Sequence, residues 1–352
     1  MFYKLVQFDN SLKSRTDLAA KWQLLEKQTA NSNYFVSWHW IGVWLETTDA
    51  AFYLLECFEE ERLIGLGVFA SDMSVNANTL YLHKTGEQKK DQIWVEHNNF
   101  LTYEAHRYTI TAGAINYLLS ELSDYQNIHV DMSECIELAF TEKFYVREKL
   151  ASVGYSKFLA PDQSISLIDT FSKNTKKQVT RSLRLLEGMG NLHLVEITAD
   201  NKQQALADIS ERHKIQWQDS EWGSGFNNEH FFQFHQKMIE KENSVLLSIQ
   251  LDDLVLGYGY FYCYQNEVLF YLSALDKHPD NKVKIGLTFH ALAMEYFREK
   301  GFLKYDFLAG DARYKKSLSD NQYTLRSYCF SKRNLLGTIE HSLRALKNKL
   351  KV

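Results

Sequence analysis

The sequence predicts the same order of structural elements twice along the chain. Each half carries amphipathic helices, two strands joined by a short acidic turn, one further strand, a helix and a final strand. This order favours α/β layers in which antiparallel hairpins and one parallel crossover share a mixed sheet. We therefore predict an α/β fold of two tandem domains, residues 1–162 and 163–352, with the boundary near Pro161. The predicted helices span 17–30, 33–46, 108–122, 175–187, 202–217, 230–242 and 285–300, and the predicted strands span 52–57, 63–69, 78–82, 100–102, 128–132, 192–198, 244–250, 255–264, 268–274, 304–308 and 323–331.

Charge and cysteine content exclude several classes of protein. The net charge of −4 argues against a protein that coats DNA or other nucleic acid non-specifically. The four cysteines lie far apart and form no C-x-x-C pair, so neither a zinc site nor a disulfide framework is expected. The sequence does not indicate an oligomeric state.

The distribution of apolar residues predicts a cytoplasmic protein. No run of about 18 apolar residues is present, so no transmembrane segment is expected. The first residues lack the apolar stretch of a signal peptide. The basic stretch 342–351 predicts an amphipathic terminal helix, either solvated or lying weakly on a membrane surface.

The segment from 268 to 316 is the most informative part of the sequence. It predicts a strand, a loop, a helix closed by Gly301, and a second strand followed by Asp-Ala-Arg-Tyr-Lys-Lys. A helix N-terminus carries unpaired N–H groups and a partial positive charge, and a glycine there lets a ligand approach the backbone. The sequence thus predicts a pyrophosphate cradle made of Lys282, Lys284, Ile285, Gly286 and Leu287. The alternative is that Gly286 serves only the packing of the helix against the strand.

Polar side chains cluster around the end of the second strand of this segment. Asp306 is expected to be half-buried and to need a partner, for which Arg181 and Lys315 are candidates. Asp311 either takes part in catalysis or caps the short helix that carries Tyr314. Groups just past the carboxyl end of a strand often line a site in open α/β sheets.

Two helices carry further candidate residues. Lys177, Arg181 and Arg184 share one helix face, which is either solvated or holds an anionic substrate or phosphate. His213 and Trp217 are four residues apart and therefore project together, although a helical histidine is more often structural than catalytic. We predict that Trp217, Lys177 and Arg181 line one substrate groove between the halves.

These motifs, in this order, resemble the CelD/BcsL-like branch of the GNAT acyltransferases, which is related to the FemAB aminoacyltransferases. The shared pattern comprises the basic helix SKNTKKQVTRSLRLLE, the His213-x-x-x-Trp217 helix, the helix IGLTFHALAMEYFREKG, and D-F-x-x-G-D-x-x-Y-K from Asp306 to Lys315. In the first half, YFVSWHWIGVWLE resembles the family's tryptophan-rich entry helix and VEHNNFL its Glu-x-Asn-x-Phe-Leu stretch. The likeness covers most of the chain and is specific over 165–316. It implies two tandem GNAT-like domains, the first degenerate or substrate-supporting and the second catalytic.

The resemblance implies transfer of an acyl group, in the first place acetyl, from acyl-CoA to an amine or hydroxyl of a sugar or of a cell-envelope or exopolysaccharide precursor, without a metal. The acceptor attacks the thioester directly, and strand 268–274 offers a backbone N–H to the developing oxyanion. Tyr314 stands where such enzymes protonate the leaving thiolate. The candidates for the general base are His213, Asp306 and Asp311. The residues expected to contact the acceptor are Lys177, Arg181, Trp217, Lys315, Glu96 and Asn99.

The sequence departs from the family pattern in two places and leaves two alternatives open. It lacks the Arg or Gln followed by two glycines that binds pyrophosphate in GNAT enzymes, and Ser317-Leu318-Ser319 stands where the family has a tryptophan. One alternative is a FemAB-like aminoacyltransferase that uses aminoacyl-tRNA, although no insertion for tRNA is seen between 200 and 245. The other is a non-catalytic binding module of a polysaccharide pathway.

Overall fold

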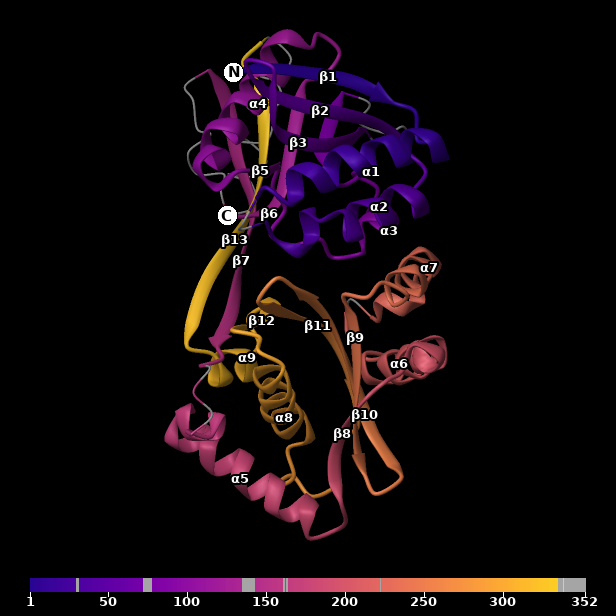
Figure 1. The fold of residues 1–352 in the computed structure, drawn as a ribbon, viewed down its shortest axis with the longest axis vertical. Coiled ribbons are helices and arrows are strands. Elements are labelled where there is room, and N and C mark those ends of the chain that lie inside the picture. The colour runs from indigo at the N-terminus through magenta and orange to yellow at the C-terminus, as the bar shows by residue number, and fades with distance from the viewer. Residues whose placement is uncertain are drawn as a thin grey trace. The chain divides into compact units, whose positions relative to one another are not determined.

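The computed structural model describes residues 1–29, 32–71, 78–134, 143–160, 162, 164–221, 223–334 and 338. Helices and strands alternate along the chain (Figure 1). The helices are α1 (Leu12–Glu26), α2 (Trp38–Thr47), α3 (Gln88–Asp91), α4 (Arg107–Glu121), α5 (Lys173–Glu187), α6 (Lys202–Gln216), α7 (Glu229–Met238), α8 (Ile285–Glu299) and α9 (Arg313–Leu318). The strands are β1 (Phe2–Phe8), β2 (Ala51–Glu59), β3 (Arg62–Ser71), β4 (Thr79–Leu82), β5 (Leu101–Thr102), β6 (Asn127–Ser133), β7 (Phe144–Phe158), β8 (Leu192–Glu196), β9 (Ser244–Leu251), β10 (Leu254–Tyr264), β11 (Glu267–Leu275), β12 (Lys304–Ala309) and β13 (Asn321–Lys332).

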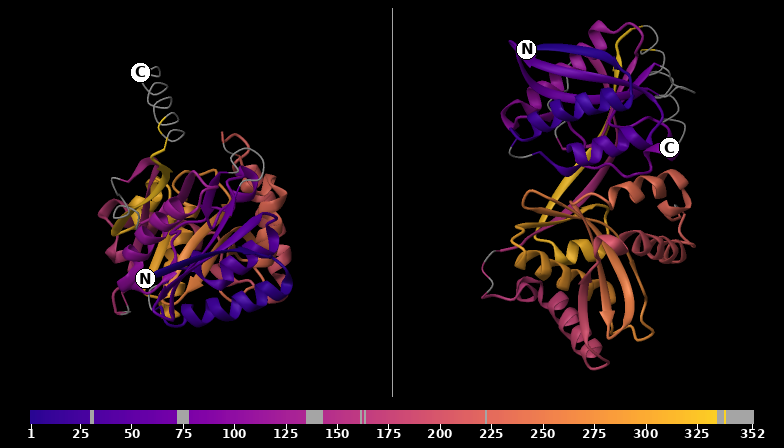
Figure 2. Two further views of the ribbon diagram at one scale, coloured as in Figure 1. Left: turned by 90° about the horizontal axis from the view of Figure 1, so that it is seen from above. Right: turned by 45° about the vertical axis from the view of Figure 1, so that its right-hand side comes forward.

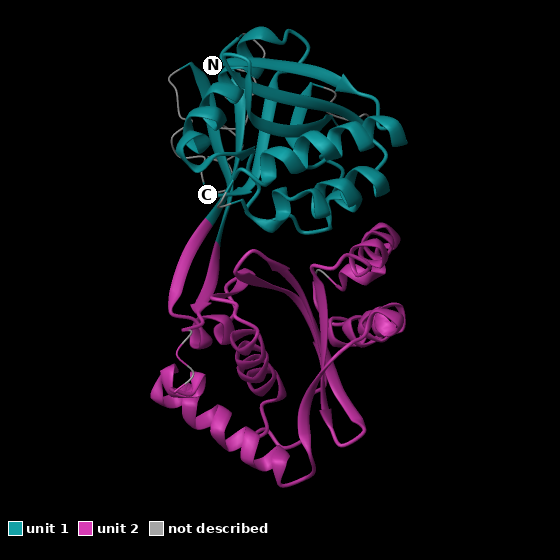
Figure 3. Cartoon of the chain, viewed as in Figure 1, with its two compact units in different colours: residues 1–152, 325–352 teal, residues 153–324 magenta. Residues whose placement is uncertain are grey.

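The chain forms two compact units (Figure 3). Unit 1 comprises residues 1–152 and 325–352, and unit 2 comprises residues 153–324. The chain passes between them twice, once within β7 and once within β13. The sequence placed a single boundary near Pro161, which lies outside the described residues. The sequence gave no sign that the chain returns to unit 1 after unit 2. That return depends on the pairing of β13 with β6, which lies about 200 positions earlier in the chain.

Unit 1 is a mixed sheet with helices on both faces. Its strand order is β1-β2-β3-β4-β6-β13, and β5 pairs with β3. Successive side chains of a strand point to opposite faces. Leu55 and Cys57 of β2 therefore pack in one core cluster with Ile110 of α4, whereas Phe52 packs against Trp44 of α2 with ring centroids 5.1 Å apart. Hence α4 covers one face of the sheet and α2 the other.

Unit 2 repeats this layered arrangement. Its strand order is β7-β12-β11-β10-β9-β8. Phe261 of β10 packs against Phe289 of α8, with ring centroids 6.0 Å apart, and its neighbour Tyr260 packs against His235 of α7 at 5.5 Å. Thus α8, with α5 against it, covers one face, and α6 and α7 cover the other (Figures 1 and 2).

The predicted α/β class and nearly all predicted elements are confirmed, although several ends differ and the short helix α3 was not predicted. Helix α1 begins at Leu12 rather than at 17, because the side chain of Ser11 caps it by accepting a hydrogen bond from the Ser14 amide. Strands β1 and β7 were not predicted. In β7 a run of charged residues interrupts the alternation of apolar and polar residues that indicates a strand. The expected helix 342–351 lies outside the described residues. No α-helix in the part of the chain that the structure describes has the length and apolar character of a membrane span.

Candidate functional site

Strands β11 and β12 of unit 2 run side by side for only a short distance. Their parallel pairing joins Glu267–Leu269 to Lys304–Asp306, whereas the strands continue to Leu275 and Ala309. On its other side β12 pairs with β7, and the register of that pair shifts between Asp306 and Ala309. The two strands therefore part just after Asp306, which leaves one edge of β11 without its parallel neighbour. Helix α8, which connects them, begins beyond the end of β11.

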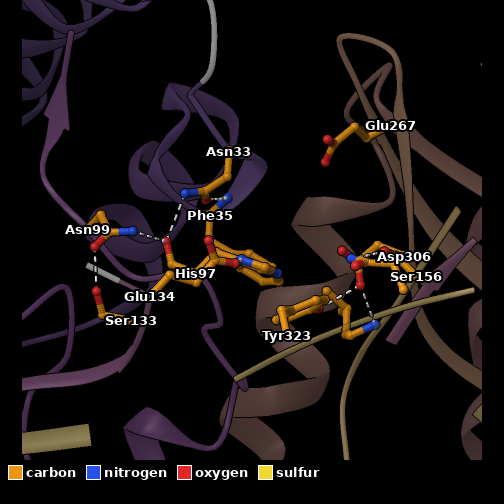
Figure 4. A network of polar contacts seen from close by, with 12 residues as sticks. Asn33, Phe35, His97, Asn99, Ser133, Glu134, Ser156, Glu267, Asp306 and Tyr323 are labelled. Atoms are coloured by element: carbon orange, nitrogen blue, oxygen red, sulfur yellow. Dashed lines mark hydrogen bonds and ion pairs between the residues drawn. The ribbon is translucent and has the colours of Figure 1, made fainter. Parts of the chain in front are cut away.

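Asp306 lies at this point of separation. It is 1% exposed, and its Oδ1 accepts hydrogen bonds from the Leu308 amide at 2.8 Å and the Tyr323 hydroxyl at 2.7 Å (Figure 4). The Lys304 ammonium stands 3.2 Å from Oδ2. Burial alone would lower the pKa of Lys304, but Asp306 and Glu267 raise it above its ordinary value.

The expectations for Asp306 need correction. It lies within β12 rather than at its end, and it is fully rather than half buried. Its partners include Lys304 and Tyr323, which the sequence did not suggest. Tyr323 comes from β13, the next strand along the chain, and sequence spacing gave no indication of that contact.

The turn after β12 accounts for the rest of the D-F-x-x-G-D-x-x-Y-K motif. Leu308 and Gly310 both have positive φ, 60° and 118°, a conformation that favours glycine. The Lys315 ammonium donates to the carbonyls of Ala309 at 2.6 Å and Leu308 at 3.3 Å, and so braces this turn. Asp311 accepts a hydrogen bond from the Tyr155 hydroxyl at 2.9 Å. The predicted helix cap at Asp311 is wrong, because Ala312 occupies the cap position of α9 and makes no side-chain hydrogen bond there.

Tyr314, on α9, packs against a histidine that the sequence reasoning missed. Its ring stacks on His290 of α8, with centroids 5.1 Å apart and planes 14° from parallel. Burial raises the pKa of Tyr314, so its hydroxyl keeps its proton at neutral pH. His290 could have been suspected from its position, because it is a histidine among the apolar, buried residues of α8.

The five cradle residues lie at the N-terminus of α8. Lys284 precedes the first helical residue, and its amide donates to the Ser182 hydroxyl of α5 at 2.8 Å. The helix begins with Ile285, Gly286 and Leu287, whose amides precede the first intrahelical bond. Lys282 is exposed, and its amide donates to Asp280 at 2.8 Å. A Cβ added at Gly286 would contact only Leu275 Cδ1, at 3.8 Å, so packing does not require a glycine there.

His213 and Trp217 lie together, as predicted, with ring centroids 5.9 Å apart. His213 is buried, its Nδ1 pairs with the Ser224 hydroxyl at 2.7 Å, and burial lowers its pKa to about 4. Trp217 is 42% exposed, so part of its side chain is in contact with solvent. A hollow of about 400 Å³ lies beside them, lined by Ala207, Ser210, Glu211, Lys214, Phe226, Asn227, Glu229 and Phe232.

The predicted groove of Trp217, Lys177 and Arg181 is wrong. Helix α5 carries Lys177 and Arg181 and lies on the α8 face of the sheet, whereas Trp217 follows α6 on the opposite face (Figure 2). Within α5, Lys177 and Arg184 are exposed, while the Nε of Arg181 is buried and has no hydrogen-bond partner among the described residues.

The two unit 1 candidates lie in the segment before β5, and Asn99 belongs to a network of polar contacts with His97 and Ser133 (Figure 4). Asn99 is buried; its amide nitrogen donates to the His97 carbonyl at 3.4 Å, and its oxygen accepts from Ser133. Asn33 also donates to the His97 carbonyl, at 2.8 Å. Glu96 is partly exposed and has partners of its own. These hydrogen bonds of Asn99 therefore stabilise the conformation of its loop. Within the described residues, no group of three or more His, Cys, Asp or Glu side chains is placed to hold a metal.

One family model matches the chain. It is described as an acetyltransferase (GNAT) domain and matches residues 173–316, from the start of α5 into α9. None of the curated proteins matches the chain.

Solved structures with the same fold extend over both units. FemX has a TM-score of 0.60 at 10% identity, over 92% of this chain and 96% of that one. The C-terminal domain of a protein assigned as a lysylphosphatidylglycerol synthetase from Agrobacterium fabrum gives 0.54 at 7%, over 92% and 95%. L-PGS from Bacillus licheniformis gives 0.52 at 9%, over 94% and 96%.

The family match and the fold likeness bear on different parts of the chain. The family match falls within unit 2, whereas the fold likeness spans both units and agrees with the element order that they share. The predicted fold of two GNAT-like domains is thus confirmed, and residues 173–316 are similar to the acetyltransferase (GNAT) domain that the family model describes.

Proposed function

We propose that unit 2 transfers an acyl group, in the first place acetyl, from acyl-CoA to an amine or hydroxyl of a sugar or of a cell-envelope or exopolysaccharide precursor. The observation that carries the proposal is the parting of β11 and β12 after Asp306, with the first turn of α8 near Leu275 at the end of the unpaired part of β11. An extended thioester donor needs a strand edge for its amides and a helix N-terminus for its phosphates. Unit 2 offers both within one strand–helix–strand unit.

The donor's pyrophosphate would lie against the first turn of α8. The amides of Ile285, Gly286 and Leu287 and the helix dipole favour an anion there. The room beside Gly286 supports this role, because a glycine that packing does not require costs the helix about 0.5–1 kcal/mol relative to alanine. Lys282 and Lys284 add positive charge. Arg181 is a further candidate, since it neighbours Ser182, which contacts the same helix end.

The residues of unit 2 can supply each step of the chemistry. The acceptor nitrogen or oxygen attacks the thioester carbonyl, whose oxygen would be stabilised by an amide on the free edge of β11. The carbon–sulfur bond then breaks, and Tyr314 gives its proton to the leaving thiolate. The acceptor loses its own proton to a base, for which Asp306, Asp311 and His213 remain candidates. Asp306 is favoured by its place where the strands part, and His213 by being uncharged at neutral pH.

Ligand-induced stabilisation tests the proposal. Acetyl-CoA, longer acyl-CoAs and free CoA should raise the melting temperature, since a ligand at a hundred times its Kd stabilises the native state by about 2.7 kcal/mol. Gly286→Val should abolish the rise. Gly188→Val, at the C-terminal cap of α5, is the matched control and should leave it intact. The proposal fails if no CoA compound raises the melting temperature at millimolar concentration.

A FemAB-like aminoacyl transfer from aminoacyl-tRNA to a peptidoglycan precursor is the second candidate. The fold likeness to FemX favours it, as does the lack of the usual pyrophosphate signature. Against it, only a short connection with one 3-10 turn, Gly225–Asn227, separates α6 from α7. Charged tRNA retained at low salt, without a response to CoA, would select this function. A response to neither would select a non-catalytic binding module.

A further inference from the structure

Within the part of the chain that the structure describes, the Tyr314 side chain is held by ring contacts and makes no hydrogen bond. One face of its ring stacks on His290, and Phe307 of β12 meets it edge-on at 6.3 Å and 77°. A flat ring stacked at 14° restricts rotation of its neighbour about the side-chain bonds, because any other rotamer would lose the contact. The orientation of Tyr314 therefore depends on whatever holds His290.

His290 is itself fixed from three directions. Its Nδ1 lies 2.9 Å from the Tyr305 hydroxyl. Phe270 of β11 packs edge-on against it at 4.6 Å and 86°, and Phe307 of β12 at 5.3 Å and 64°. It is only 2% exposed. Residues from both strands that part at Asp306 therefore set the position of one imidazole ring.

The charge on this ring is also fixed. Burial, assisted by the nearby Lys315, lowers the pKa of His290 to about 3, so the ring is neutral at neutral pH. An imidazolium against the Tyr314 ring would favour the tyrosinate, whereas a neutral ring leaves the phenol proton in place. The ionisable groups facing His290 are Tyr305, Tyr314 and Lys315.

We infer that His290 is a positioning residue for Tyr314: its ring, anchored to Tyr305 and packed between β11 and β12, holds the tyrosine in the orientation from which it protonates the leaving thiolate. The inference rests on the proposed function, because that function gives Tyr314 its role. His290 exchanges no proton with the substrates. Its contribution is geometric, so the property to test is the flat ring rather than the imidazole nitrogens.

Two double variants separate the ring from the polar pair. Both His290→Phe/Tyr305→Phe and His290→Leu/Tyr305→Phe remove the buried hydrogen bond without leaving an unpaired polar group, but only the first keeps an aromatic ring against Tyr314. With acetyl-CoA and an amino sugar as probes, release of free CoA gives kcat and the donor KM. The leucine pair should have a kcat about 10- to 100-fold below that of the phenylalanine pair at an unchanged donor KM, because a misplaced catalytic group costs this much.

Equal kcat values for the two double variants, at equal stability, would overturn the inference. Tyrosines labelled with fluorine provide a readout that does not need turnover, with Tyr314→Phe assigning the signal. The Tyr314 resonance should stay sharp and unshifted in the phenylalanine pair and should shift or broaden in the leucine pair. Identical Tyr314 signals in the two pairs would also overturn the inference. If the wild type neither binds nor cleaves acetyl-CoA, the proposed function fails, and the fluorine signal still decides whether His290 holds Tyr314.

Discussion

Each unit contains one parallel strand pair connected by a helix, and the two pairs end differently. In unit 1, β4 and β6 pair over Thr79–Tyr81 and Asn127–His129, as short a stretch as that of β11 and β12 in unit 2. In unit 1, the segment that follows β4 comes back to the ends of β4 and β6 and bonds to both strands through Asn98. The loop after β11 instead leads to Ser182 on α5, to which the Lys284 amide donates.

Asn98 bridges the two parallel strands of unit 1. Its backbone amide donates to the Met132 carbonyl of β6 at 3.0 Å, and its side chain donates to the Leu82 carbonyl of β4 at 2.8 Å. Its side-chain oxygen lies 2.9 Å from Nδ1 of His83. One buried asparagine therefore joins the two strands at the level where those of unit 2 part. The same topology thus allows two outcomes: a side chain of the protein can bridge the ends of the parallel strands, or the strand ends can stay apart with room for a ligand.

The largest effect on stability should come from Asp306 at the open pair. Asp306→Ala takes the acceptor from the Leu308 amide and the Tyr323 hydroxyl and removes one of the two carboxylates beside Lys304, and each buried donor left unpaired costs about 1–3 kcal/mol. Urea unfolding would measure the loss. Asp311→Ala, which removes one hydrogen bond from an exposed carboxylate, should cost about 1 kcal/mol. Equal losses of unfolding free energy for the two variants would mean that the Asp306 carboxylate contributes no more to stability than an exposed one.

Asn98→Ala should produce the next largest loss, at the closed pair. It removes two hydrogen-bonding atoms from a buried site and leaves the Leu82 carbonyl unpaired, which costs about 2–3 kcal/mol. Asn116→Ala is the matched control, because Asn116 is a partly exposed helical residue that bonds only within α4. The quantity to measure is the difference between the two variants in the free energy of unfolding by urea. A difference near zero would mean that the contacts of Asn98 do not stabilise the strand pair of unit 1.

Acidification should weaken both units, since each buries a neutral histidine. Burial lowers the pKa of His83 in unit 1 to about 4 and that of His290 in unit 2 to about 3. The unfolded chain binds these protons at higher pH, so the stabilisation is complete above about pH 6.5 and is lost as the pH falls towards 4. Between pH 7 and 5 each histidine should cost about 1–2 kcal/mol of unfolding free energy. A flat stability profile from pH 7 to 5 would contradict the burial of these rings.

Gly286→Ala should have the smallest effect and the opposite sign. Its new Cβ meets only Leu275, at 3.8 Å, so the helix should gain about 0.5–1 kcal/mol. Gly259→Ala should destabilise the same unit, because its Cβ would lie 2.3 Å from the Phe289 ring. Thermal unfolding separates the two signs. A destabilised Gly286→Ala would restore the packing explanation for this glycine.

The sequence predicted the local order of elements well and the long-range contacts poorly. Helix α8 and its flanking strands have clear apolar periodicity, so Gly286 was correctly placed at a helix start and Tyr314 after the following strand. The contact of Asp306 with Tyr323 was missed because Tyr323 reaches it only through the pairing of strands. The role of Asn98 was missed for the same reason, since its partners lie on β4 and β6.

The most direct test is the number of acyl-CoA molecules that one chain binds. We expect one, because Asn98 bridges the parallel strands of unit 1, whereas β11 and β12 of unit 2 part after Asp306. Isothermal titration calorimetry with acetyl-CoA should therefore give a stoichiometry of one for the wild type and for Asn98→Ala, and no binding to Gly286→Val. Two molecules per chain, or binding that survives Gly286→Val, would contradict the assignment of a single donor site at α8.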